Sequence, residues 1–174
     1  LSELITGKAD FSGRLPYTYP RYDGVIEFYD HPGSVARAKS GQFTAYNPQW
    51  DFGFGLSYNY AQISNVQFVS KNETLGTFSV SVTIKNDTKQ LTKTVVPVYL
   101  SDLYASTTPE GKRLIGFNKV TLNPGENKTI VFKFDANNLK RIAADGKWRS
   151  EKGTFEIKVA DQVLTFNLSN DIDF

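Results

Sequence analysis

Hydrophobic and polar residues alternate along most of the chain from Gln62 onward. The clearest run is GTFSVSVTIKN, whose apolar side chains occupy every second position: Phe78, Val80, Val82 and Ile84. Such alternation is typical of a β-strand that buries one face and exposes the other. The runs TIVFKFD, TFEIKVA and VLTFNLS show the same pattern around residues 130–134, 155–159 and 164–168. The pattern therefore predicts a series of short strands in this part of the chain.

The run TKTVVPVYLSDL differs because it is apolar on both faces from Val95 to Leu100. This indicates a strand that is covered on two sides, although Pro97 lacks an N–H and requires a sheet edge or a bulge. Turns are expected at residues 123–126 (NPGE) and 145–147 (DGK), and a short helix over residues 137–144. About seven short strands separated by turns predict an all-β fold, an immunoglobulin or fibronectin type III-like antiparallel β-sandwich.

The first third of the chain has a different pattern. LSELITG, residues 1–7, places apolar residues at helical spacing before a glycine, which predicts the last turns of a helix. SGRLPYTYP, residues 12–20, predicts a short extended segment that ends at a proline. Residues 21–49 show neither period and predict a long irregular loop. Since so short a helix needs packing partners, we expect the chain to begin inside an element of a longer protein.

Composition and charge exclude several classes of function. Twenty Lys and Arg residues against 18 Asp and Glu give a net charge of +2, which offers no reason to expect a nucleic-acid or membrane partner. Cys is absent, so disulfides and thiolate metal sites are excluded. The single histidine, His31, cannot form a zinc-binding cluster and gives no support for a Ser-His-Asp triad. Met is also absent, so we expect an excised piece or a mature product.

The carboxylates give no pair that a cleft would hold together for acid–base chemistry. The acidic residues considered lie in expected turns or on polar strand faces: Asp102, Glu110, Glu126, Glu151 and Glu156. We therefore predict no catalytic residue, no metal site and no cofactor in this chain. Four Asn-x-Ser/Thr sequences match the glycosylation motif, which also arises by chance: Asn72, Asn86, Asn127 and Asn167.

The segment QWDFGFGLSY, residues 49–58, gathers aromatic side chains around two glycines. Aromatic rings stack on sugars, and Tyr46 and Trp50, near the irregular loop, are the candidates for substrate contact. Two glycines permit close backbone approach, however, and this favours a packed interdomain junction over an open binding platform. The residues expected in this junction are Phe52, Gly53, Phe54, Gly55, Leu56 and Tyr58.

Several motifs resemble those of glycoside hydrolase family three. SGRLPYTYP is similar to the family's Ser-Gly-basic-Leu-Pro-x-Thr-aromatic-Pro segment, and FGFGLSY to its Phe-Gly-aromatic-Gly-Leu-Ser-Tyr junction. LIGFNKVTLNPGE and DGKWRSEKGTFEIKVAD resemble two later stretches of the family, in the same order. The resemblance therefore runs over essentially the whole chain. The sequence departs from the family pattern at Asp51, Phe54, Ile115 and residues 86–88, and none of these changes removes a known functional group.

The resemblance implies a domain organisation. In this family a (β/α)8 barrel with the aspartate nucleophile is followed by an α/β sandwich domain, usually with the general acid/base, and often by a fibronectin type III-like module. Residues 1–20 would then be the C-terminal remnant of the α/β sandwich domain. Residues 21–61 would be a long loop and interdomain junction, and residues 62–174 the fibronectin type III-like domain. The catalytic carboxylates would lie upstream of this chain, in a periplasmic or secreted enzyme.

By resemblance, the chain is a non-catalytic C-terminal segment of a β-glucosidase that hydrolyses terminal β-glucosyl residues of oligosaccharides. The segment would buttress its partners, the upstream catalytic domains, and its loop would border the substrate entrance. An alternative is an autonomous carbohydrate-binding module that uses Tyr46 and Trp50. A third hypothesis is that the chain is one polypeptide of a nicked enzyme, with the remaining domains held noncovalently as a separate chain.

Overall fold

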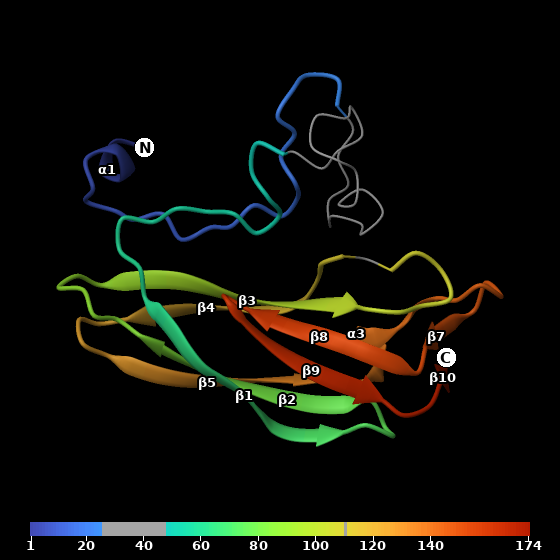
Figure 1. Cartoon of the computed structure of the whole chain (residues 1–174). Coiled ribbons are helices and arrows are strands. Elements are labelled where there is room, and N and C mark those ends of the chain that lie inside the picture. Colours follow the sequence, from blue (N-terminus) through green and yellow to red (C-terminus); the bar gives the residue numbers. More distant parts are fainter. Residues whose placement is uncertain (26–47, 110) are drawn as a thin grey trace.

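The computed structural model describes residues 1–25, 48–109 and 111–174, which Figure 1 shows as a β-sandwich with an irregular first part. Residues 62–174 form two larger antiparallel sheets and a small third sheet at one end. The first part of the chain, drawn in blue and cyan, lies over the outer face of one sheet. The predicted all-β sandwich is therefore confirmed, whereas the division into domain remnants stays a prediction.

The first sheet contains β1 (Gln62–Asn72), β2 (Thr77–Lys85) and β5 (Asn127–Phe134), in the order β1-β2-β5. Because β2 is the central strand, it has a partner along both edges. Its alternating apolar side chains point into the core, and Val80 and Ile84 are fully inaccessible to solvent. The period-two pattern in this strand therefore predicted both the strand and its buried face.

The second sheet contains β4 (Arg113–Leu122), β3 (Thr92–Asp102), β8 (Gly153–Val159) and β9 (Gln162–Leu168), in the order β4-β3-β8-β9. All three strand pairs are antiparallel. Each large sheet thus combines pairs of consecutive strands with one pairing of strands far apart in sequence, β2 with β5 in the first sheet and β3 with β8 in the second.

Pro97 shows how a proline fits into β3. It is paired with Phe117 of β4, whereas the pairing with β8 begins only at Tyr99. The β8 side of β3 is therefore open at position 97, where a proline leaves no ladder hydrogen bond unmade. A register shift between Val98 and Tyr99 follows directly. The expectation of an edge or a bulge at this proline is confirmed.

The small third sheet has the order β10-β7-β6, from β6 (Arg141–Ile142), β7 (Trp148–Ser150) and β10 (Ile172–Asp173). Trp148 is 50% exposed in the middle strand of this sheet. The ring lies under the Lys140 ammonium, with 5.5 Å between the nitrogen and the ring centroid.

The helix before this sheet, α3 (Ala136–Leu139), is shorter than the sequence predicted. Asp135 caps its start, with a side chain that accepts a hydrogen bond from the Asn137 N–H. Lys140 already has an extended backbone, at φ −65° and ψ 150°, and the chain continues into β6. The helix predicted over residues 137–144 is therefore wrong in extent, because strand pairing takes over after one turn.

The two large sheets meet in one hydrophobic core. Its largest rings are Phe78 of β2, Phe155 of β8 and Phe166 of β9, each at most 2% exposed. The rings of Phe78 and Phe166 lie 4.9 Å apart across the sheets, centroid to centroid. Burial of one such side chain contributes about 1.5–3 kcal/mol. Residues 62–174 therefore form a hydrophobic core of their own.

A buried asparagine joins the two sheets at one end. Asn86, directly after β2, is fully inaccessible, and its amide nitrogen lies 3.1 Å from the Leu122 carbonyl of β4 and 2.8 Å from the Gln90 carbonyl. Its side-chain oxygen accepts hydrogen bonds from the N–H and the hydroxyl of Thr88. Because a buried polar group is stable only when it is paired, Asn86 fixes this turn in one geometry.

Candidate interdomain junction

Two segments of the first part of the chain pair with each other. We call residues 12–20 and 48–60 together the junction ribbon. The Leu15 N–H donates to the Phe54 carbonyl and the Gly53 N–H to the Leu15 carbonyl, each at 2.8 Å. Farther along, the Tyr19 N–H donates to the Trp50 carbonyl at 2.8 Å. These bonds hold the segments antiparallel, and they explain the extended pattern that the prolines indicated.

Phe52 anchors the junction ribbon on the sandwich. Its side chain is only 3% exposed, and its ring meets the ring of Tyr99 edge to face at 5.3 Å. Tyr99 belongs to β3 but points away from the core, toward the ribbon. The second apolar face of β3, which the sequence had indicated, is therefore covered here by Phe52.

Both glycines of the FGFG motif are required by close contacts. Gly53 has φ +85°, a region that favours glycine, and a Cβ at this position would collide with the hydroxyl of Tyr99. A Cβ on Gly55 would collide with the carbonyl of Gly13 and lie 2.8 Å from Cδ of Arg14. The first glycine thus lets the ribbon approach the sandwich, and the second lets its two segments approach each other.

Four aromatic rings form a strip along the ribbon: Tyr17, Tyr19, Trp50 and Phe54. Consecutive ring centroids lie 6.1, 5.1 and 6.1 Å apart, and the last pair, Trp50 and Phe54, is stacked with an interplanar angle of 17°. Each ring is about 40% exposed. Beside the strip is an open pocket of about 390 Å³, lined by Pro48, Gln49, Trp50, Asp51 and Phe54.

Asp10 ties the end of the ribbon to the start of the chain. Its carboxylate accepts hydrogen bonds from the N–H groups of Tyr58 at 2.8 Å and Asn59 at 2.9 Å. The Tyr58 hydroxyl in turn donates to the carbonyl of Leu4, in the short helix α1 (Ser2–Ile5). Partial burial raises the pKa of Asp10, but these hydrogen bonds lower it by more, so the net shift is downward.

Burial and nearby charges shift the pKa values of two residues at the contact between the ribbon and the sandwich, Lys112 and Tyr99. Burial lowers the pKa of Lys112, and the nearby carboxylate of Asp51 raises it by less. Burial also raises the pKa of Tyr99, and the Arg14 cation lowers it by less. Both shifts are typical of ionisable groups in a partly dehydrated contact.

The first part of the chain also exposes large apolar side chains. Leu1 is 91% exposed, Ile5 71%, Leu56 66% and Tyr58 56%. In contrast to Phe52, none of these four side chains is covered by the sandwich. Exposed apolar surface of this density is typical of a protein–protein contact.

The structure brings together most residues that the sequence singled out here. Phe52 and Gly53 contact the sandwich and Gly55 contacts the other ribbon segment, while Leu56 and Tyr58 are exposed. Their role in an interdomain junction stays a prediction. Tyr46 and His31 fall outside the described residues.

Sequence reasoning missed Tyr99 and Lys112, although the two-sided apolar pattern of β3 was a signal for the first. Within the described ranges, no cluster of three metal-ligating His, Cys, Asp or Glu side chains forms, and no helix is long and apolar enough to cross a bilayer.

Comparisons with known proteins match both the domain and the whole chain. Residues 94–163 match the model of the fibronectin type III-like domain. A periplasmic β-glucosidase of Salmonella typhimurium is 34% identical over 90% of this chain and 22% of its own length. A putative β-xylosidase of Formosa agariphila is 33% identical over 95% of this chain and also 22% of its own length. The chain thus spans about a fifth of these relatives.

A solved structure matches the first part and the sandwich together. The β-glucosidase of Listeria innocua, solved with glucose, aligns with 97% of this chain and 26% of its own, at a TM-score of 0.80 and 25% identity. The alignment therefore extends beyond the fibronectin type III-like domain and includes the first part of the chain. Together, the matched domain, the relatives and the shared fold show that this chain belongs to glycoside hydrolase family three, as part of its C-terminal region.

Proposed function

We propose that this chain is the non-catalytic C-terminal segment of a β-glucosidase-type hydrolase and that it buttresses the upstream catalytic domains. Hydrolysis of terminal β-glucosyl residues from oligosaccharides would belong to the intact enzyme. The single observation that carries the proposal is the uneven distribution of exposed apolar side chains. Eleven exposed large apolar side chains fall among the 39 described residues of the first part, residues 1–25 and 48–61, against twelve among the 112 described residues of the sandwich; Leu1, Ile5 and Leu56 are each more than 60% exposed.

The physical argument concerns the surface that has no cover. Large apolar side chains lose free energy of about 25 cal/mol per Å² when a partner removes them from water. The junction ribbon is held rigidly enough to present such a surface, because Phe52, Gly53 and Asp10 fix its course. Relatives about four to five times longer than this chain supply the kind of partner that the surface requires.

Two finer parts of the proposal concern location and the long loop. We propose a periplasmic or secreted enzyme, since the relative from Salmonella typhimurium is a periplasmic β-glucosidase. We also propose that the loop of residues 21–49 borders the substrate entrance of the intact enzyme. Most of this loop lies outside the described residues.

The experiment compares the 174-residue chain alone with the same chain joined to its upstream region. Hydrolysis of an aryl β-glucoside is expected only when the upstream region is present. A matched variant, Leu56→Asp in the joined protein, places a charge in the proposed contact and is expected to lower activity or thermal stability. Turnover by the isolated chain, or a joined protein indifferent to Leu56→Asp, would contradict the proposal.

A carbohydrate-binding module is the second candidate, and one observation favours it. The pocket beside Trp50 and Phe54 combines aromatic rings with the polar side chains of Gln49 and Asp51. Against it, Trp50 is stacked on Phe54 and also contacts Tyr19, so part of its ring surface is already used within the chain.

Oligosaccharide titration by isothermal calorimetry, whose signal does not depend on Trp50, separates the two candidates. A binding module predicts saturable binding by the isolated chain, which Trp50→Ala abolishes. Trp148→Ala is the matched control, since this other tryptophan is 50% exposed on the sandwich. Absence of binding by the unmodified chain, or equal binding by both variants, would remove the second candidate.

A further inference from the structure

Lys112 stands where the sandwich meets the junction ribbon. Its ammonium nitrogen donates a hydrogen bond of 2.6 Å to the carbonyl of Phe52. The same nitrogen lies 4.3 Å from the ring centroid of Tyr99 and 5.5 Å from that of Phe52. A single cation therefore contacts the backbone of the ribbon, the ring that anchors the ribbon and the ring of the sandwich that receives it.

A cation suits this position better than a neutral side chain of similar size. The two ring faces carry negative potential, and the Phe52 carbonyl presents its oxygen to the same point. Gly53, the next residue, lies so close to Tyr99 that the ribbon has little room to shift. The position of Lys112 thus determines where the ribbon rests.

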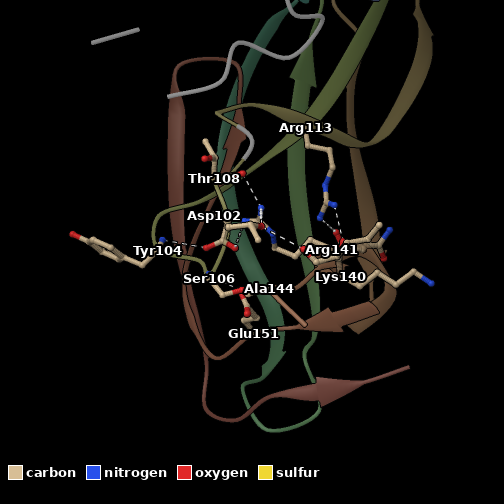
Figure 2. A network of polar contacts seen from close by, with 12 residues as sticks. Asp102, Tyr104, Ser106, Thr108, Arg113, Lys140, Arg141, Ala144 and Glu151 are labelled. Carbon is tan, nitrogen blue, oxygen red and sulfur yellow. Dashed lines mark hydrogen bonds and ion pairs between the residues drawn. The ribbon is translucent and has the colours of Figure 1, made fainter. Parts of the chain in front are cut away.

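Lys112 directly precedes β4 in the loop that follows β3, of which residues 103–109, 111 and 112 are described. Figure 2 shows polar contacts of this loop. The guanidinium of Arg141 donates to the Thr107 hydroxyl at 2.6 Å and to the Thr108 carbonyl at 2.8 Å. It also forms an ion pair with Asp102 at 3.7 Å. Both partners of that pair are more than 90% buried.

The loop has two further attachments. Arg113, the neighbour of Lys112, donates to the carbonyls of Lys140 at 2.8 Å and Asn138 at 2.6 Å. On the other side, the Ser106 N–H donates to the carboxylate of Glu151 at 2.9 Å. The loop is therefore braced against α3, β6 and the residue after β7, at the end of the sandwich that bears the small sheet.

We propose that Lys112 is the positioning residue that fixes the junction ribbon on the sandwich, and that the buried Arg141–Asp102 pair holds the loop that carries Lys112. The ribbon and the small sheet, which share no strand pairing, are then coupled through this loop. A substitution of Arg141 then alters the attachment of the ribbon through the loop, and not through a direct contact between Arg141 and the ribbon. The inference concerns this chain alone, so its failure leaves the proposed hydrolase function untouched.

The test is amide hydrogen exchange on the 174-residue chain, with peptides that cover the ribbon and the sandwich read separately. Lys112→Met keeps the length of the side chain and removes its charge, and it is expected to raise exchange of the Gly53 and Leu15 amides about tenfold. Amides of β2 should not change. Lys119→Met, at an exposed position of β4, is the matched control and should leave both regions unchanged. Unchanged ribbon exchange in Lys112→Met would overturn the first half of the proposal.

A second pair of variants tests the brace. Thr107→Val removes one acceptor of Arg141 without leaving a charge alone, and Arg141→Met removes the cation itself. Both are expected to raise exchange in residues 103–112 and in the ribbon, with the larger effect for Arg141→Met. Should Arg141→Met fail to fold, Thr107→Val alone decides the outcome. Faster exchange in the loop with an unchanged ribbon would overturn the second half of the proposal.

Discussion

The sandwich and the junction ribbon use similar side chains in opposite ways. In the sandwich, Phe78, Phe155 and Phe166 are at most 2% exposed and pack against one another across two sheets. In the ribbon, Leu56 and Tyr58 are more than half exposed. The sandwich therefore completes its own core, whereas the ribbon leaves these apolar side chains exposed. Both regions are rich in apolar residues, so composition does not tell which side chains are buried. The arrangement of the strands does, because only the two large sheets enclose a core.

The two regions also differ in how firmly they are held. Each strand of the large sheets has long antiparallel pairing, while the ribbon meets the sandwich through Phe52, Lys112 and an Asn59–Gln90 contact of 3.3 Å. Regions with few buried contacts open locally at a lower free energy than the core. Changes in the sandwich should therefore affect global unfolding, and changes in the ribbon should affect local opening.

The largest effect is expected from truncation of a core ring. Phe78→Ala should lower the free energy of unfolding by about 3–5 kcal/mol, because the cavity lies between two packed sheets. The corresponding change in the ribbon, Phe54→Ala, removes a ring that is 38% exposed. It should change the free energy of unfolding by less than about 0.5 kcal/mol. Urea denaturation followed by circular dichroism measures both. Equal losses would show that ribbon and sandwich form one cooperative unit, against the comparison.

The next effect concerns the asparagine that joins the sheets. Asn86→Ala removes the hydrogen bonds that this side chain donates to the carbonyls of Gln90, Leu122 and Asn123, and we expect a loss of about 3 kcal/mol. For a domain of this size, this corresponds to a fall in melting temperature of about 10 °C. Asn127→Ala, at the exposed start of β5, is the control and should melt as the unmodified chain does. A small shift for Asn86→Ala would mean that the turn closes without its polar contacts.

Two glycines with positive φ separate global from local effects. Gly125 has φ +76° with open space around its Cα, so Gly125→Ala should reduce global stability by about 1 kcal/mol through backbone strain alone. Gly53→Ala adds a collision with Tyr99 and should release the ribbon while the sandwich stays folded. Urea titration and hydrogen exchange of the Leu15 amide distinguish the two. If Gly53→Ala lowered the free energy of global unfolding by more than Gly125→Ala does, the ribbon would not open locally as proposed.

The smallest effect is the dependence of the ribbon on pH. The pKa of Asp10 is lower in the folded chain than its ordinary value of 3.8, so the charged form stabilises the folded contact. This stabilisation is fully present above pH 3.8 and is lost as the pH falls through the lower folded value. Exchange or NMR shifts of the Tyr58 and Asn59 amides should therefore change in that acidic window. Asp10→Asn should abolish the dependence, and a transition that persists in this variant would assign it to another group.

Much of the sandwich could be predicted because its strands are long enough to show a period. The alternation around Phe78 and Ile84 predicted β2 and its buried face, and the proline in β3 predicted an open edge. The strands of the small sheet have only two or three residues each, too few for any period to appear. The helix predicted over residues 137–144 is too long, because Arg141 pairs with β7 and this pairing ends the helix. The two-residue strand β6 gave no pattern that could have indicated this.

The junction was only partly accessible to prediction from sequence. The motif FGFG indicated a packed contact, and both glycines do lie in close contacts. Its contact site on the sandwich, formed by Tyr99 and Lys112, lies 46 and 59 residues after Gly53 and carries no motif of its own. Contacts of this kind depend on how the sheet places β3 and its loop beneath the ribbon, which no local pattern encodes.

The buried asparagine also limits chemical modification of the chain. Asn86 begins one of the four Asn-x-Ser/Thr sequences, yet its amide nitrogen is inside the folded protein, 2.8–3.1 Å from backbone carbonyls. A glycan attached there would have to be added before folding and would then keep the two sheets from closing. In a cell that glycosylates its secreted proteins, the rate at which this turn folds would decide whether the chain matures or is lost.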